Sequence, residues 1–489
     1  MKNKGSIITL VLVFGGIFLV LMGGLFGFIL LQQRQSLQRA AWNESLHLAE
    51  AGVNYYRWHL RHLPDDLQDG QAWCCESPPC EVCGPYEHSY SDGISKVEGK
   101  FSLEIEGRVQ CGKVATVTIT STGWTDKFPQ TKRKVSVSYI RSTVADFAYL
   151  LNDNVWAGSD REIKGPYHSN GGIRMDGENN ALVTSARSTW VCTDSFGCDV
   201  CPISAGCAMV GADCVCPGVF TTANGDEELF RYPIPPFDFA GITMDLAEIK
   251  DLTKNHGEGV YLPPSGEKGY YVMLNKETID VYKITDLGAV YAYDLEEGWH
   301  WEYSVIDVKD AVPQTLSLPS DCGLVFVEDD LWIDGEVEGN LTVVSADLET
   351  PIEETNIWIT GDITYQNKDG LDGLVLLAQH NNLISLSVAP EPGERLELHG
   401  IYIAQTGHFG RNHYDCSMYP IDCIKDYLEV YGSIVSEGRV GTRWSYSWGG
   451  IASGFELREN IYDPEQSFNP PPFLPCISDE YGLKEWEEL

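Results

Sequence analysis

Closely spaced cysteines are the residues of this 489-residue chain with the most recognisable chemistry. The spacings Cys80-x-x-Cys83 and Cys198-x-x-Cys201 suit a zinc hairpin, a redox dithiol or separate disulfides. Zinc requires thiolates, and no basic residue near these pairs favours thiolate formation. We therefore expect disulfides and no bound metal or other cofactor, with zinc and redox-active pairs as the alternatives. The predicted disulfide cysteines are Cys74, Cys75, Cys80, Cys83, Cys192, Cys198, Cys201, Cys207, Cys214, Cys216, Cys416 and Cys423.

Two further groups of polar side chains are candidates for ligand binding. One lies beside Cys416 and would suit catalysis or carboxylate recognition: His408, Arg411, His413 and Asp415. The other, Asp329-Asp330 with the acidic stretch 345–369, would suit Ca²⁺. Polar residues are common in loops, and no EF-hand or RTX-type repeat is present, so we expect both groups to be structural. The sequence also has no G-x-S-x-G, Walker, H-E-x-x-H or Rossmann motif, and we predict no enzyme activity.

Charge and cysteine content restrict the class of partner and the compartment. Lys and Arg number 34 against 71 Asp and Glu, a formal charge of −37. Phosphate binding needs clustered basic residues, so we predict no nucleic-acid partner. Residues 1–62 carry six basic and two acidic groups, so the remainder carries −37 − 4 = −41. All fifteen cysteines lie in that acidic remainder, which indicates an oxidising environment outside the cytoplasm.

An uncharged apolar run covers residues 7–31. As a helix these 25 residues reach about 37 Å, enough to cross a bilayer. Lys2 and Lys4 precede the run, which predicts a cytoplasmic N-terminus and an extracellular bulk in a single-pass membrane protein. A cleaved secretory signal has a shorter apolar core and a small-residue cleavage site, and neither fits here.

The same helix is predicted to continue beyond the apolar run. No proline occurs before Pro64, and a stripe of residues at spacings of four or seven marks one helix face. The residues of that stripe are Leu37, Ala41, Leu48, Gly52, Tyr56 and Leu60. The pattern predicts one helix over about 6–62, half of it in lipid and half outside.

Two short motifs in this segment resemble type IV pilins. Lys2-Asn3-Lys4-Gly5-Ser6 before the apolar helix resembles a class III prepilin signal, cut between Gly5 and Ser6. Ala49-Glu50-Ala51-Gly52 resembles the helix signature of PilX-like minor pilins. The resemblance implies a prepilin peptidase and other pilins or pilus assembly proteins as partners. Major pilins carry Glu where this chain has Leu10, and that departure resembles minor pseudopilins at filament tips.

The body of the chain is predicted to be mostly β. Alternating apolar residues near 101–105, 114–119 and 135–139 predict a small antiparallel sheet that covers one face of the helix, as in a pilin head. Beyond residue 145 a template with a fixed glycine recurs, as in Leu331-x-Ile333-x-Gly335-x-Val337. Such units stack into solenoids, which favours a right-handed parallel β-helix, with a β-sandwich as the alternative. Residues 165–171 and the chain end also resemble β-helical domains appended to PilX-like pilins.

We thus predict an α+β, mostly β chain. Its expected segments are a prepilin leader at 1–5, the transmembrane and pilin helix at 6–63, a cysteine-containing loop with the antiparallel sheet at 64–145, and the solenoid-like domain at 146–489 with a Cys-rich insertion at about 190–320. The expected function is a non-catalytic, minor pilin-like surface protein at the membrane or pilus tip that binds a surface glycan or protein. Alternatives are a permanently anchored binding protein and a β-helical polysaccharide-degrading enzyme, since Trp299-His300-Trp301-Glu302-Tyr303 and Trp444-Ser445-Tyr446-Ser447-Trp448 could stack on sugars.

Overall fold

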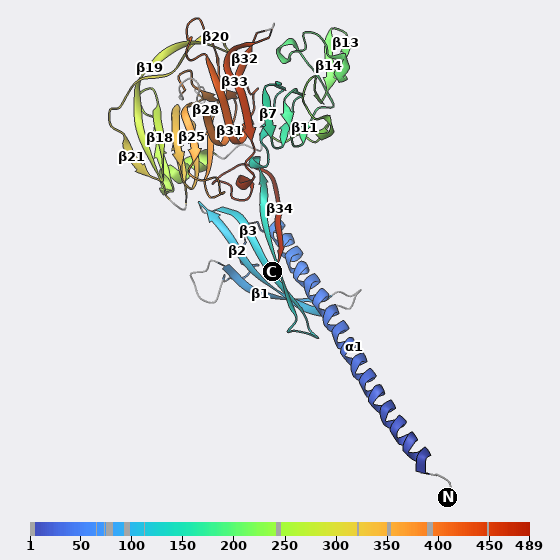
Figure 1. Ribbon diagram of the computed structural model, residues 1–489. Helices are drawn as coiled ribbons and strands as arrows, with labels where there is room; N and C mark the ends of the chain where they lie inside the picture. Colours follow the sequence, from blue (N-terminus) through green and yellow to red (C-terminus); the bar gives the residue numbers. More distant parts are fainter. Residues whose placement is uncertain are drawn as a thin grey trace. The chain divides into compact units, whose positions relative to one another are not determined.

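The chain forms two compact units, which we describe separately (Figure 1). The first consists of Met1–Arg108, Thr116–Ile140 and Tyr481–Leu489, and the second of Val109–Ala115 and Arg141–Glu480. The computed structural model describes residues 5–64, 66–72, 74, 82–91, 98–111, 113–240, 246–319, 322–349, 354–388, 395–446 and 449–489. A long N-terminal helix and a large, mostly β remainder confirm the α+β prediction.

The first unit is a long helix on a five-stranded sheet. Helix α1 runs unbroken over Gly5–His62, close to the predicted bounds. The strand order is β1-β2-β3-β4-β34, with antiparallel pairing of β1 with β2 and of β3 with β4. The strands are β1 (Val82–Ser91), β2 (Glu98–Gln110), β3 (Lys113–Thr125), β4 (Lys132–Thr143) and β34 (Cys476–Glu488).

The last strand corrects the predicted extent of the second domain. The sequence predicts one domain over residues 146–489, but β34 pairs beside β4, and Tyr481–Leu489 belongs to the first unit. The backbone N–H of Leu489 donates to the carbonyl of Lys134, 3.1 Å away. The second unit is therefore an insertion in sequence between two neighbouring strands of the first sheet.

The second unit is built from parallel ladders of short strands. One ladder begins at β17 (Val260–Leu262) and β22 (Leu324–Val327) and ends in strands from the start of the unit. After β22 its strands are, in spatial order, β24 (Asn340–Ser345), β26 (Gly373–Ala378), β28 (Arg395–Ala404), β31 (Ile424–Ser436), β5 (Tyr149–Leu151), β8 (Tyr167–Ser169) and β11 (Val183–Ser185). Because β5 pairs with β31, the strand near residue 149 extends the ladder beyond the strand near residue 434, although the two are far apart in the sequence.

A second ladder shares β28 and β31 with the first. Its strands are β18 (Tyr270–Lys276), β23 (Leu331–Val337), β25 (Ile357–Tyr365), β28, β31, β33 (Ile451–Ile461), β7 (Arg161–Lys164) and β10 (Glu178–Asn179). Shorter parallel pairs connect β25 with β27 (Asn382–Ile384), β27 with β29 (Phe409–Gly410), and β9 (Ile173–Met175) with both β6 (Val155–Ala157) and β15 (Val219–Phe220). Inward aliphatic side chains such as Ile333, Ile359 and Leu398 form the core of the unit.

In β28 and β31 the glycine of the repeated template marks the bend between the two ladders. Gly335, Gly400 and Gly432 have φ of 120°, 145° and 136°, a region that side chains with a Cβ rarely adopt. In β28, residues before Gly400 pair with β25, and residues after it pair with β26. Glycine therefore allows a strand to bend, so that its first residues pair in one ladder and its last residues pair in the other.

The predicted insertion at about 190–320 is not one continuous segment. Residues 189–217 do form a separate small sheet of β12 (Thr189–Val191), β14 (Asp213–Pro217) and β13 (Ala208–Val210). However, β17 and β18 pair in parallel with β22 and β23, so they lie within the ladders. Between the two regions lie β16 (Phe230–Arg231) and the short helix α2 (Leu246–Asp251).

A long antiparallel ribbon extends from the ladders. Strand β19 (Thr278–Asp294) pairs with β20 (Gly298–Lys309) along most of its length. Near its end β19 also pairs with β30 (His413–Tyr414), and near its start with β21 (Gln314–Ser317). Strand β32 (Arg443–Ser445) pairs antiparallel with β33.

Candidate functional site

The N-terminal half of α1 has no covering element among the described residues. The large apolar side chains from Ile7 to Leu31 are exposed, and α1 is long and apolar enough to cross a membrane. The predicted cleavage site between Gly5 and Ser6 falls at the first turn of this helix, and residues 1–4 lie outside the described residues. The apolar half therefore requires a non-aqueous environment.

The other half of α1 is seated on the sheet at the predicted Ala49-Glu50-Ala51-Gly52 motif. Ala49 is fully buried, whereas Glu50 faces outward and lies 3.3 Å from Nδ1 of His47. A Cβ on Gly52 would overlap Oγ of Ser121 and lie 2.8 Å from the Phe101 ring. The motif thus places its small residues where helix and sheet backbones approach most closely.

The approach is equally close from the sheet side. A Cβ on Gly123 in β3 would overlap the backbone N of Ala49 and the carbonyl of Ser45. The Ser45 hydroxyl lies 2.7 Å from the carbonyl of Ala41 and 2.8 Å from that of Thr131. The sequence motif therefore marks one side of a two-sided contact, and Gly123 supplies the other.

The loop after α1 is tied to the helix by two aspartates. Nε2 of His59 lies 3.0 Å from Oδ2 of Asp66, and Nε2 of His88 lies 2.6 Å from Oδ2 of Asp69. The hydroxyl of Tyr55 donates to Asp69 over 3.1 Å, and burial together with the Asp69 charge raises the pKa of Tyr55 to about 12. These contacts fix the C-terminal end of α1 against the unit that it belongs to.

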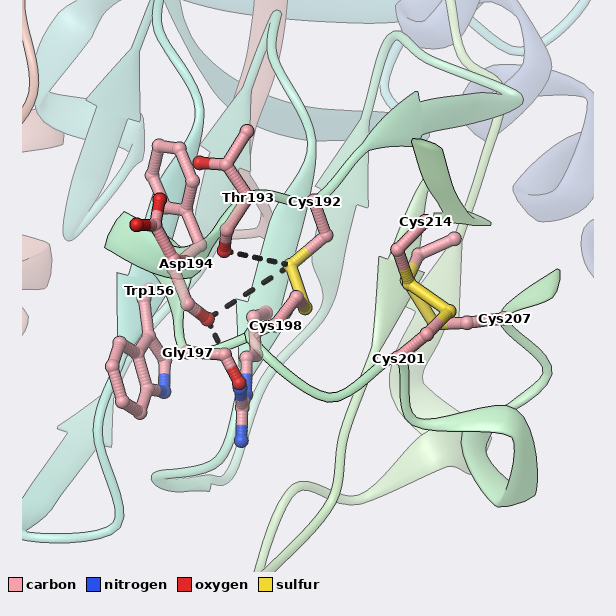
Figure 2. Close-up of a disulfide and its surroundings, with 12 residues drawn as sticks. Trp156, Cys192, Thr193, Asp194, Gly197, Cys198, Cys201, Cys207 and Cys214 are labelled. Carbon is pink, nitrogen blue, oxygen red and sulfur yellow. Dashed lines mark hydrogen bonds between the residues drawn. A yellow bond between two sulfur atoms is a disulfide. The ribbon is translucent and has the colours of Figure 1, made fainter. Parts of the chain in front are cut away.

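The predicted cysteines lie in several local disulfides. Among the cysteines predicted to form disulfides, the pairs in the described part of the chain are Cys74–Cys83, Cys192–Cys198, Cys201–Cys214, Cys207–Cys216 and Cys416–Cys423. Cys75 and Cys80 lie outside the described residues. Three of these pairs cross-link the small sheet of residues 189–217 (Figure 2).

The pairing of the disulfides differs from what a zinc hairpin or a redox dithiol at Cys198 and Cys201 would require. A zinc hairpin or redox dithiol would need Cys198 and Cys201 to act together, but Cys198 bonds to Cys192 and Cys201 to Cys214 (Figure 2). Sulfurs of neighbouring disulfides come close to one another, as Cys214 and Cys216 do at 3.8 Å. A disulfide sulfur carries no thiolate charge, so this proximity follows from the crowded cross-links and does not define a metal centre.

One disulfide was missed by sequence reasoning. Cys111 bonds to Cys322 across a sequence separation of 211 residues. Both side chains are buried in a cluster with Leu324 and Val344 within the second unit. No spacing signal exists for such a distant pair, because its formation depends on the fold that brings its ends together.

In the polar group beside Cys416, Arg411 is buried and bonded to the backbone. Arg411 is 1% exposed, and its guanidinium donates to the backbone carbonyls of Cys423, Leu386 and Asp422. Burial lowers the pKa of Arg411 and of His413. Arg411 therefore holds three loop carbonyls together, as expected for a structural role.

The first two residues of the acidic candidate group, Asp329 and Asp330, also bind the backbone. Asp329 accepts from the backbone N–H of Ser265 at 2.8 Å, and Asp330 accepts from that of Asn356 at 2.7 Å. These carboxylates satisfy the backbone between rungs of the ladders.

The two aromatic stretches, separate in sequence, lie together in space. The rings of Trp299 and His413 have centroids 5.2 Å apart, and those of His413 and Trp444 are 5.7 Å apart. Ser447 and Trp448 lie outside the described residues. The ribbon β19–β20 thus carries an aromatic surface that continues onto β30 and β32.

Comparison with known proteins provides little independent information. No protein-family model and no curated protein matches the chain. Among solved structures, the chain is similar to the competence-associated pilin ComZ from Thermus thermophilus, with 12% identity over 92% of this chain and 97% of that chain. The TM-score is 0.29, a value too low for us to draw any conclusion from the likeness.

Proposed function

We propose that this chain is a minor pilin-like, membrane-anchored surface protein. In this proposal a prepilin peptidase cuts between Gly5 and Ser6, and residues 7–31 hold the chain in the membrane or enter the tip of a filament. One observation carries the proposal: a single unbroken helix has an uncovered apolar half and a second half seated on an antiparallel sheet through Ala49 and Gly52. An anchor with a simple stalk needs no such seat on a sheet.

We further propose that the second unit is a right-handed parallel β-helix that displays a binding surface outside the cell. The parallel ladders and the positive φ of Gly335, Gly400 and Gly432 support this architecture. Lys2 and Lys4, which precede the apolar run, and the disulfides of the second unit support an extracellular location of that unit.

The proposed role is adhesion or partner binding without catalysis. An enzyme acting on polysaccharides would need carboxylates poised over a groove. A cavity of about 330 Å³ does contain Asp160, Glu162, Glu178 and Glu459. However, Arg458 pairs with Asp160 at 2.5 Å, and Lys164 pairs with Glu459 at 2.5 Å and with Glu162 at 3.1 Å, so three of these four carboxylates are already engaged. Release of reducing sugars from cell-wall glycans by the intact protein would overturn the non-catalytic proposal.

N-terminal sequencing of the membrane-extracted protein tests the pilin proposal. A start at Ser6, with a methylated amine, is expected. A start at Met1 would leave a permanently anchored protein, and a start beyond Leu31 would contradict both anchored hypotheses.

A matched pair of variants sharpens the processing test. Gly5→Arg is expected to accumulate the uncut precursor, because the peptidase would have to accept a long cationic side chain at the cleavage site. Gly441→Arg is the control, since a Cβ added at Gly441 meets no atom within 4 Å and the site is far from the cleavage site in sequence, and it is expected to be processed normally. Equal processing of the two variants would contradict the prepilin signal.

A further inference from the structure

One face of the ribbon β19–β20 collects aromatic side chains. In the antiparallel register Tyr291 lies opposite Trp301 and Tyr293 opposite Trp299, while Tyr303 lies two residues beyond Trp301 on the same strand. Side chains at such positions share one face of a sheet. Trp299, Trp301 and Tyr303 are 45%, 57% and 61% exposed, so this face is open to solvent.

The rings of this face support one another. The centroid of Tyr291 lies 5.1 Å from that of Trp299 and 5.3 Å from that of Trp301. Tyr293 lies 5.6 Å from Trp299 and 5.5 Å from Trp444. We call these seven residues the aromatic platform: Tyr291, Tyr293, Trp299, Trp301, Tyr303, His413 and Trp444. Rings held by ring neighbours lose little freedom when a ligand stacks on them, which favours binding.

The opposite face of the ribbon is fixed to the body of the second unit. Glu302 is buried there and accepts from Nδ2 of Asn412 and, over 2.9 Å, from the hydroxyl of Tyr414. The carbonyl of Ser304 accepts from Nε1 of Trp332 at 2.6 Å. The platform is thus carried by a ribbon whose inner face is locked by buried hydrogen bonds.

The charge around the platform restricts its ligand. On the ribbon, residues 285–308 contain no Lys or Arg, and their six acidic residues are Asp286, Asp294, Glu296, Glu297, Glu302 and Asp307. The cation next to Trp444, Arg443, lies 3.4 Å from the carboxylate of Asp160. The acidic charge of the ribbon repels polyanions such as nucleic acids, acidic glycans and anionic lipid surfaces. Asp294 accepts from the backbone N–H groups of Glu296 and Glu297, and Glu296 lies 3.4 Å from His380. The exposed carboxylate of Glu297, two residues before Trp299 in the sequence, offers hydrogen-bond acceptors beside the platform.

A pyranose ring matches these two features at once. Its C–H face is apolar and stacks on an exposed aromatic ring, while its hydroxyl or amino groups point sideways and donate hydrogen bonds to carboxylates. We propose that the aromatic platform binds a polysaccharide whose sugar rings carry no negative charge. The inference rests on the proposed function, because it names the ligand that the displayed unit would meet outside the cell.

Isothermal titration calorimetry of the full-length protein in detergent tests this inference. The probes are cellohexaose, which is neutral, a chitosan hexamer, which is cationic, and polygalacturonate, which is anionic. Saturable binding of cellohexaose or the chitosan hexamer, with much weaker binding of polygalacturonate, is expected. Binding of polygalacturonate as tight as that of the others, or no heat with any probe, would overturn the proposal.

A pair of tryptophan variants locates the binding. Trp301→Ala is expected to weaken binding on the order of ten-fold, the effect of removing one stacking ring. Trp58→Ala in α1 is the matched control, because Trp58 is also 57% exposed, and binding is expected to be unchanged. Equal affinity of the two variants would overturn the assignment of the platform.

Two readouts keep the outcomes separate. Trp301→Phe keeps a ring at that position and is expected to restore most of the affinity, which excludes misfolding as the cause of loss. The N-terminal residue of the same preparation reports on pilin processing, so a failure to bind glycans is distinguishable from a failure of the proposed pilin function.

Discussion

The two halves of α1 share one secondary structure and differ in what covers them. From Ile7 to Leu31 the large apolar side chains are exposed, whereas Ala49, Tyr56 and Leu60 are buried to within 1% of full coverage. The sheet of the first unit provides that cover for the second half. The first half is more apolar than the second, yet none of the described residues covers it, so lipid or other helices would have to remove its hydrophobic side chains from water.

Glycines show the same contrast. A Cβ added at Gly15, Gly16, Gly23, Gly24 or Gly27 would meet no atom within 4 Å, so nothing in the first unit requires glycine there. At Gly52 an added methyl group would meet Ser121 and Phe101. Glycines in the first half of α1 therefore have open space around them, whereas Gly52 in the second half allows the helix to lie close to the sheet.

The largest expected effect comes from placing a charge in the apolar half. Leu19→Asp is expected to reduce insertion into the membrane about 100-fold, since a carboxylate at the centre of a span costs roughly 2.5–3.5 kcal/mol. Flotation of the full-length protein with lipid vesicles measures the bound fraction. Leu37→Asp is the control, because Leu37 is also exposed but lies beyond the apolar run. Equal losses from the two variants would contradict a boundary between the halves.

An intermediate effect is expected from adding one methyl group to each half. Gly52→Ala is expected to destabilise the first unit by about 1–3 kcal/mol, because the helix must move away from Ser121 and Phe101. Gly24→Ala meets open space and gains the higher helix propensity of alanine, so unchanged or slightly higher stability is expected. Thermal unfolding of both full-length variants in detergent compares them. Destabilisation by Gly24→Ala of the same size would contradict the proposed seat of the helix.

Local patterns explain what could be predicted from the sequence. The extent of α1 followed from an uncharged run and a helical stripe, both of which depend on neighbouring residues. The template glycines predicted bends because a positive φ is a local requirement, as Gly400 and Gly432 show. The Ala49–Gly52 motif indicated the helix–sheet contact, but not Gly123, whose partner atoms lie more than seventy residues away in sequence.

Non-local pairing explains what could not be predicted. The return of β34 to β4, the pairing of β5 with β31, and the bond between Cys111 and Cys322 each join segments hundreds of residues apart. The aromatic platform is of the same kind, since Trp299 and Trp444 stand in separate stretches of the sequence and are brought together through the rings of Tyr293 and His413, which both of them contact. The spacing of residues within either stretch does not predict that the two stretches lie together in the fold.

The smallest expected effect concerns the hydrogen bonds of Asp66, which lies in the loop after the covered half of α1. Asp66 accepts from the backbone N–H groups of Gln68 and Gly70, each at 2.7 Å, and lies beside His59. Burial pulls the pKa of Asp66 upward, but these N–H groups and His59 outweigh it and hold the pKa below the ordinary value. A carboxyl whose folded pKa is depressed contributes stability above its unfolded pKa of about 3.9, and that stability is lost as the pH falls through the folded value.

Asp66→Asn should therefore lower the stability of the first unit by about 1 kcal/mol at neutral pH, the net value of one ordinary hydrogen bond, because asparagine keeps one of the two acceptor oxygens. The variant should also lose less stability than the native chain when the pH is lowered from 5 to 3, because the titrating carboxyl is gone. Urea unfolding of the full-length protein at each pH measures both effects. The control is Asp126→Asn, at an exposed carboxylate of the same unit, which is expected to leave both the stability at neutral pH and its loss at low pH unchanged. An identical pH dependence of all three proteins would show that the hydrogen bonds of Asp66 contribute nothing to the stability of the first unit.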